Sequence, residues 1–285
     1  MYKLTIENDL GGRLEFQDLY GPYQITEIEG LNPPTATINT TEMGLIDGVR
    51  YSSSKLAART LNIAFAILYD VESNRLNAYK VLRAKRRVKV SYKNDHRDVC
   101  AYGYVEKVAV GYYDQTQIVT ATILCPSAYW IAAQSIVSDM SVVKKTFHFP
   151  FGSTAAKEVV FGYIDPLAST DIANDGDVDT GMVIELYARE ALSNPTVYDY
   201  TTKDYFGLDI DMQQADLITV DTRAGNKTAI LTRNAKDTNV FYAIRKGSKW
   251  LQLPTGGGVY VYSVGSGEAT ALAVTITHSD QYEGV

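Results

Sequence analysis

The sequence predicts a mainly β protein of two domains. Most apolar segments are short and alternate with polar residues, only one stretch has a helical pattern, and the C-terminal half carries many short strand candidates between Gly, Asn, Asp and Pro clusters. A chain of 285 residues can bury one large core or two ordinary ones, and this pattern favours two. We place an α+β domain with antiparallel strands at residues 1–130 and a β-sandwich at 131–285.

The first domain begins its clearest pattern at Leu61, from which apolar residues alternate through Ile67 as in a strand with one buried face. Asp70 is a candidate N-cap, and Val71–Arg86 is predicted to be a helix with a basic last turn. Three strands are expected to follow, at Val88–Tyr92, Val99–Val110 and Thr116–Leu124. Pro126 ends this pattern because it cannot donate to a ladder.

The second domain has the regular strand spacing that is typical of a β-sandwich. Its candidate strands are Phe147–Phe151, Met182–Ala188, Phe206–Ile210, Leu217–Asp221, Thr228–Thr232, Val259–Val264 and Thr270–His278.

Composition and charge exclude several classes of function. The net charge of −6 and the pI near 5.2 argue against a nucleic-acid-binding surface, because phosphate neutralisation needs clustered Lys and Arg. The only basic cluster lies at the end of the predicted helix, where cations complement the helix dipole. No signal peptide or run of about 18 apolar residues is seen, so synthesis in a cytoplasm without membrane association is expected. Cys100 and Cys125 flank a predicted hairpin and could be neighbours on adjacent strands, but in a reducing compartment they should stay thiols.

Motifs for chemistry are missing from the sequence. The three histidines, His96, His148 and His278, lack partners at metal-ligand spacing. The acidic loop that starts at Asp171 fails the EF-hand pattern at Ala173 and Met182. We therefore expect no catalytic residue, no metal and no cofactor.

The segment Ile28–Phe65 contains a long polar excursion that comes before the core strand at Leu61. It contains the Gly30/Pro33/Pro34 turn, Ile38–Thr41, Asp47-Gly48, Tyr51, Leu56 and Arg59, and it resembles the N-terminal signature of siphophage distal tail proteins. Further blocks follow in that family's order, at 125–129, 174–182, 194–197, 216–222 and 248–256. Gln214-Ala215-Asp216 departs from the family's alanine-glycine-aspartate turn, and Thr255–Gly258 from its proline-glycine-asparagine turn.

The resemblance implies a structural hub rather than an enzyme. Such a protein forms a homohexameric ring through its N-terminal domain, carries galectin-like or carbohydrate-module-like C-terminal domains outside, and lets DNA pass. Its expected partners are the major tail-tube protein, a tail-associated tip protein and a receptor-binding protein, at the tip of the virion tail. We expect subunit or tail-tube contacts in the polar excursion, at Asn39, Thr40, Thr41, Asp47, Tyr51 and Arg59.

Two hypotheses concern individual side chains. An acidic channel would repel DNA phosphates, and its candidate residues are Glu7, Asp9, Glu15, Asp18, Glu27, Glu29 and Glu42. In the alternative function, a carbohydrate-binding module that contacts the host wall, Trp250 would stack on a sugar, although a buried structural Trp is favoured. For Arg59, a solvated strand-edge position, a packing role and an inter-subunit ion pair are all open.

Overall fold

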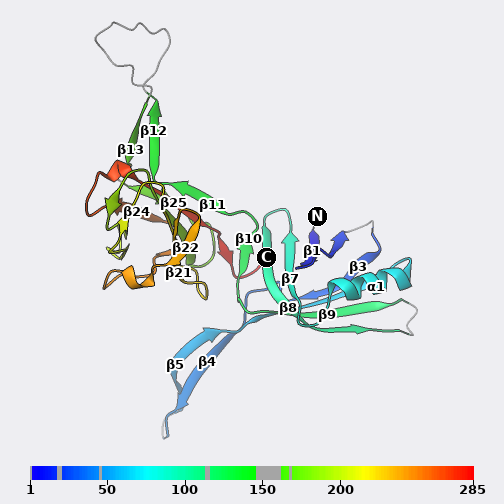
Figure 1. Ribbon diagram of the computed structural model, residues 1–285. Coiled ribbons are helices and arrows are strands. Elements are labelled where there is room, and N and C mark those ends of the chain that lie inside the picture. The colour runs from blue at the N-terminus through cyan, green and yellow to red at the C-terminus, as the bar shows by residue number, and fades with distance from the viewer. Residues whose placement is uncertain (1, 18–20, 45–46, 113–115, 146–161, 167–168) are drawn as a thin grey trace. The chain divides into compact units, whose positions relative to one another are not determined.

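The computed structural model describes residues 2–17, 21–44, 47–112, 116–145, 162–166 and 169–285. Its contacts form two compact units, Met1–Ala133 with Gln281–Val285, and Gln134–Asp280 (Figure 1). Residues 281–285, which the strand pattern of the sequence assigned to the second domain, thus belong to the first unit. Among the described residues, no helix is both long and apolar enough to cross a membrane.

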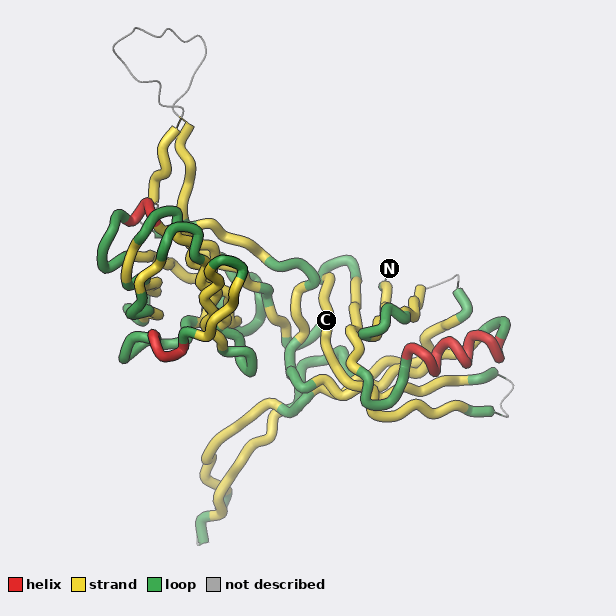
Figure 2. The backbone as a smooth tube through the Cα atoms, in the orientation of Figure 1, coloured by secondary structure: helices red, strands yellow, loops and turns green. Residues whose placement is uncertain are grey.

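The first unit is built on a nine-stranded antiparallel sheet (Figure 2). Its main path runs β2-β1-β7-β8-β9-β6-β3, and β10 and β26 join beside β8. The strands are β1 (Lys3–Asn8), β2 (Arg13–Gln17), β3 (Tyr23–Glu29), β6 (Arg59–Ile67), β7 (Arg87–Lys93), β8 (Asp98–Val110), β9 (Ile118–Cys125), β10 (Trp130–Ala132) and β26 (Gln281–Tyr282). The expected alternation in β6 is confirmed, since Leu61, Ile63, Phe65 and Ile67 are all buried.

One helix, α1 (Val71–Val81), packs against β1, β2 and β6 and buries Ala78 and Val81. It is five residues shorter than predicted. The side-chain amide of Asn8 donates to the carbonyl oxygens of Lys80 and Val81, which satisfies acceptors of the last turn. Lys85 then takes a left-handed φ of 67° and donates its N–H to Val105. The basic residues therefore lead into β7 instead of extending the helix.

The start of the helix also differs from the expectation. Asp70 occupies the N-cap position, but it is left-handed and its side chain makes no capping hydrogen bond. The side chain of Asn74 donates to the carbonyl oxygen of Tyr69 instead.

The two cysteines are free and buried, as expected of thiols packed as small apolar groups. They are not opposite each other. Cys100 of β8 pairs with Ser91 of β7 and with Ile131 of β10, and the pairing of β8 with β9 places Leu124, next to Cys125, opposite Tyr104. Burial raises the pKa of the Cys125 thiol to about 11.

The second unit is a β-sandwich, which confirms the predicted mainly β fold class. One sheet has the order β11-β25-β15-β20-β21-β22, with β23 beside β15, and the other has the order β14-β24-β17-β18. The first sheet comprises β11 (Ile136–Asp139), β15 (Thr180–Ala188), β20 (Leu217–Asp221), β21 (Thr228–Arg233), β22 (Lys236–Asn239), β23 (Gln252–Leu253) and β25 (Leu272–His278). The second comprises β14 (Thr170–Ile172), β17 (Thr196–Asp199), β18 (Tyr205–Gly207) and β24 (Gly258–Ser263).

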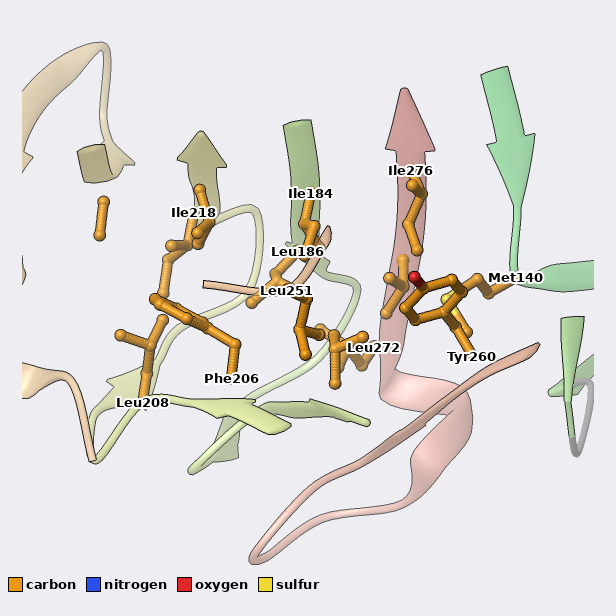
Figure 3. Close-up of a cluster of buried hydrophobic side chains, with 14 of the residues drawn as sticks. Met140, Ile184, Leu186, Phe206, Leu208, Ile218, Leu251, Tyr260, Leu272 and Ile276 are labelled. Carbon is orange, nitrogen blue, oxygen red and sulfur yellow. The ribbon is translucent and has the colours of Figure 1, made fainter. Parts of the chain in front are cut away.

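Residues from both sheets meet in one core. Figure 3 shows Ile184, Leu186 and Ile276 of the first sheet beside Phe206 and Tyr260 of the second. Alternate residues of β25 are buried, as the sequence predicts for a strand with one core face.

Short elements complete the second unit. They are the strand pairs β12 (Ser141–Lys145) with β13 (Gly162–Pro166) and β16 (Leu192–Ser193) with β19 (Asp211–Met212), and the short helices η1 (Phe241–Ala243) and η2 (Ala269–Ala271). The predicted strand Phe147–Phe151 lies outside the described residues.

Candidate assembly surface

Residues 36–56 form a hairpin, here called the arm, that extends away from the nine-stranded sheet (Figure 1). Its strands β4 (Ala36–Glu42) and β5 (Val49–Leu56) pair with each other and, within the described chain, with no other strand. Every residue of β4 is exposed, and so is every residue of β5 except the partly buried Leu56. An isolated two-stranded hairpin is at best marginally stable in water, so the arm is suited to packing against another molecule.

The register gives the arm two different faces. Ile38, Thr40 and Glu42 share one side of β4, and their cross-strand partners are Ser54, Tyr51 and Val49. A hydrogen bond of 2.9 Å between the hydroxyls of Tyr51 and Ser54 is consistent with this assignment. Ile38, Val49 and Tyr51 are 54%, 58% and 60% exposed. We call this side of the hairpin the apolar face of the arm.

The opposite face of the arm is polar. Asn39 pairs with Ser53 and donates to its hydroxyl oxygen over 2.9 Å. The same side carries Thr37 beside Lys55 and Thr41 beside Arg50. The pairing skips Ser52, which marks a bulge in β5. Because of this bulge, Tyr51 and Val49 lie on the same side of the hairpin as Ile38, Thr40 and Glu42.

The structure brings five of the six predicted contact residues together. Asn39, Thr40, Thr41, Asp47 and Tyr51 all lie exposed on the arm. The prediction omitted Ile38 and Val49, although the alternation of apolar and polar residues in each strand carried the signal.

Arg59 lies elsewhere, because its side chain is buried at the start of β6 with 4% exposure. Nη1 donates to the carbonyl oxygens of Gly30 and Asn32, Nε and Nη2 donate to Ala128, and Nη2 also donates to Glu283 over 2.5 Å. Its guanidinium lies 5.3 Å from the ring centroid of the buried Trp130. These contacts replace the predicted solvated or inter-subunit position with a packing role at the base of the arm.

Gly30 is required where the chain leaves the sheet for the arm. Its φ is 93°, and a Cβ on Gly30 would lie 2.2 Å from the carbonyl oxygen of Thr60. Only glycine combines this conformation with such a close approach. The turn that the family signature begins with therefore has a structural cause.

The candidate channel residues fall into two groups. Glu7 and Glu15 both form ion pairs with Arg13, and Asp9 pairs with Arg86. Glu27 and Glu29 instead line a groove of about 310 Å³ together with Asn62, Ala64 and Thr120. Glu42 lies on the arm, and Asp18 lies outside the described residues.

The groove lies on a sheet face made of short polar and acidic side chains from β3, β6 and β9. Asn62 donates to the Glu29 carboxylate over 2.8 Å, and no described cation forms an ion pair with either glutamate of the groove. The carboxylates of Glu27 and Glu29 thus keep their negative charge, whereas the charges of Glu7, Glu15 and Asp9 are largely neutralised by arginine partners.

Trp250 is engaged by side chains of its own unit. Its ring centroid lies 5.1 Å from that of Phe206 and 5.7 Å from that of Phe241, and the ammonium of Lys227 is 5.7 Å from the ring. The side chain is partly buried against the sandwich core. This packing matches the structural role that the sequence favoured, whereas glycan contact at Trp250 stays a prediction.

The described residues offer no cluster of three or more His, Cys, Asp or Glu side chains that could hold a metal ion. His96 lies in the turn between β7 and β8, where its N–H donates to the side chain of Asn94.

The turn at Gln214–Asp216, where the sequence departs from the family pattern, has a backbone conformation that favours the family's glycine. Ala215 has a φ of 69°, in the left-handed region that glycine adopts without a Cβ penalty. We expect Ala215→Gly to raise the free energy of unfolding by about 0.5–1 kcal/mol, with the gain reduced by the greater freedom of glycine in the unfolded chain. Urea denaturation monitored by circular dichroism measures this effect, and a destabilised variant would contradict it.

Comparison with known proteins agrees with the fold and with the resemblance. Residues 175–282 match the family model described as siphovirus-type tail component, C-terminal domain. The sandwich is thus similar to the C-terminal domain of a siphovirus-type tail component, and the resemblance to siphophage distal tail proteins is confirmed.

Two solved structures share the fold over the whole chain. The crystal structure of SPP1 Dit (gp 19.1), described as a paradigm of the hub adsorption apparatus in phages that infect Gram-positive bacteria, has a TM-score of 0.68 at 15% identity and 98% coverage of both chains. A chain of the phage P2 baseplate in its activated conformation with Ca has a TM-score of 0.57 at 13% identity, with both chains fully covered. No curated protein matches the sequence.

Proposed function

We propose that this chain is the hub of a phage tail tip: six copies form a ring that joins the tail tube to tip and receptor-binding proteins and lets DNA pass. The observation that carries the proposal is the exposed arm, whose apolar face has no partner within the described chain. Similarity to structures of a hub protein and of a baseplate supports a place in such an assembly.

The arm supplies the contact between neighbouring subunits in this proposal. Burying Ile38, Val49 and Tyr51 on a second copy stabilises the ring through removal of apolar area from water. Thr40, on the same face, and Asp47, in the turn of the hairpin, form the polar rim of this contact. Asn39 and Thr41 lie on the opposite face and are assigned to contact with the tail tube.

Ring formation is tested by substituting the apolar face. We expect Ile38→Ser with Tyr51→Ser to raise the concentration for half-assembly by at least about tenfold, because each truncated anchor costs roughly 1–3 kcal/mol per contact. Mass photometry over a concentration series measures this. The melting temperature of the isolated chain should change little, since both side chains are exposed.

The matched control changes the polar face of the same hairpin. Thr37→Ser with Lys55→Ser should leave assembly close to wild type, because these residues lie opposite the apolar face. Equal assembly of both double variants would reject the apolar face as the contact. A wild-type chain that stays monomeric at high concentration would contradict self-assembly itself.

For DNA passage, we propose that the groove face with Glu27 and Glu29 lines the channel. The other candidates on the sheet are held in ion pairs, so these two carboxylates supply most of the repulsion toward phosphate. The neutral side chains Asn62, Ala64 and Thr120 leave this face without a cation to bind DNA.

Reversing the charge of the groove tests this assignment. Rings of Glu27→Lys with Glu29→Lys should retain short duplex DNA at low salt and release it as salt rises, whereas wild-type rings should not retain it. The control, Asp171→Lys with Asp175→Lys, makes the same charge change at exposed sites of the second unit. Equal DNA retention by both variants, or a ring structure with a neutral or basic channel, would refute the acidic channel.

A further inference from the structure

Residues 281–285 return to the first unit after the chain has passed through the second. Within this segment β26 forms an antiparallel pair with β10, in which Tyr282 lies opposite Trp130 and Gln281 opposite Ile131. Tyr282 and Val285 also pack against the core of the first unit. The segment is therefore part of the fold of that unit.

Two arginines hold this segment from different strands. Arg59, at the start of β6, donates through Nη2 to the carbonyl oxygen of Glu283. Arg97, in the turn between β7 and β8, donates through Nη1 to the carbonyl oxygen of Gly284. Its guanidinium carbon also lies 4.2 Å from the ring centroid of Tyr282.

The same segment contacts the entry of the arm. Val285 donates its N–H to the carbonyl oxygen of Leu31 over 3.1 Å. Gly284 lies so close to Pro33 that a Cβ there would be 3.1 Å from its Cδ. Arg59 binds Gly30 and Asn32 on the same stretch, and Ala57 donates to Thr35 where the arm ends.

We propose that residues 281–285 act as a clasp that fixes the direction of the arm. The hairpin has no other strand pairing in the described chain, so its position depends on residues 30–35 and on the start of β6. Arg97 and Tyr282 are positioning residues. Arg97 contacts Tyr282 and Gly284 of the clasp, and the clasp in turn contacts residues 31–33. The consequence for assembly rests on the proposed function, because a pre-oriented arm loses less conformational freedom when it binds a neighbour.

The arm direction can be measured directly with two spin labels. Ser73→Cys on α1 and Thr41→Cys on β4 are exposed, whereas the native Cys100 and Cys125 are buried. Double electron–electron resonance, with the labelled chain diluted in unlabelled chain, then reports only distances within one subunit. We expect one narrow distribution in the parent protein and a clearly broader one in Arg97→Ala and in Tyr282→Ala.

Two variants separate the clasp from a general loss of packing. Tyr282→Phe keeps the aromatic ring under Arg97 and should keep the narrow distribution. Arg87→Ala removes a similar contact, of Arg87 over the Tyr102 ring at 5.0 Å, and should leave the distribution narrow. Thermal unfolding confirms that each variant is folded before its distances are compared.

The outcomes distinguish the clasp from the ring. A distribution that stays narrow in folded Arg97→Ala and Tyr282→Ala would overturn the clasp, whatever their assembly. A broader distance distribution in these variants supports the clasp. A rise of about tenfold in their half-assembly concentration, which corresponds to about 1.4 kcal/mol, would show that the clasp also favours ring formation. Broadening with unchanged assembly would support the clasp and count against the arm as the ring contact.

Discussion

Replacement of Arg59 by alanine is expected to lower the free energy of unfolding of the first unit by about 3–5 kcal/mol, because each carbonyl oxygen that stays buried without a donor costs about 1–3 kcal/mol. Four carbonyl oxygens, of Gly30, Asn32, Ala128 and Glu283, would lose their donor. The face of Trp130 would lose its covering cation as well. Urea denaturation followed by circular dichroism measures the loss.

Lysine at position 59 should recover only part of this loss. It keeps the charge but has one compact ammonium in place of a planar fork, so it cannot reach all four acceptors. As a control, Arg13→Ala removes an arginine that is 47% exposed and pairs with the surface carboxylates of Glu7 and Glu15, and it should cost less than about 1 kcal/mol. Equal costs for Arg59→Ala and Arg13→Ala would refute the role we assign to Arg59.

Replacement of Asp216 by asparagine is expected to lower the free energy of unfolding of the second unit by about 2–4 kcal/mol at pH 7. The carboxylate, whose side chain is 2% exposed, accepts hydrogen bonds from Arg233 Nη2 at 2.5 Å and from the Gln213 N–H at 2.7 Å. Asparagine would leave the guanidinium without its counter-charge. Because Arg233 is 34% exposed, water would replace part of the lost interaction.

The effect of Asp216→Asn should depend on pH. Hydrogen bonds from Arg233, and then from the Gln213 backbone, hold the pKa of Asp216 below its usual value. A lowered folded-state pKa gives stability that is complete above the unfolded-state pKa of about 4 and is lost as pH falls through the folded-state value. The difference between wild type and variant should therefore shrink in acid, as urea denaturation at several pH values would show.

Asp209 provides the comparison within the same unit. It also pairs with an arginine, Arg245, at 2.7 Å, but its side chain is 59% exposed. Asp209→Asn should cost less than about 1 kcal/mol. If Asp216→Asn cost no more than Asp209→Asn, burial would not be what makes the Asp216 pair important.

The sequence predicted those features that depend on local pattern. The alternation through Leu61–Ile67 predicted which side chains of β6 are buried, and the spacing of short strands after Pro126 predicted a sandwich. The end of α1 was not predictable, because the side chain of Asn8 and the left-handed turn at Lys85 stop a helix that the basic residues could have continued. Contacts from distant residues decided that boundary.

The candidate site shows the same division. The long polar excursion indicated a contact surface outside the core, and the exposed positions Asn39, Thr40, Thr41, Asp47 and Tyr51 agree with it. The apolar face needed the register of β4 with β5, since each strand alone has two faces and neither reveals which side lacks a partner.

By itself, then, the sequence determined the mainly β fold class, the resemblance to siphophage distal tail proteins and the polar excursion before Leu61, because strand periodicity, turn residues and motif order are local properties. Only the tertiary structure decided which groups are partnered: it buried Arg59 among carbonyl oxygens, paired Glu7 and Asp9 with arginines, and returned residues 281–285 to the base of the arm. Charge compensation and packing join residues far apart in the chain, and no local pattern encodes which distant partner a side chain will meet.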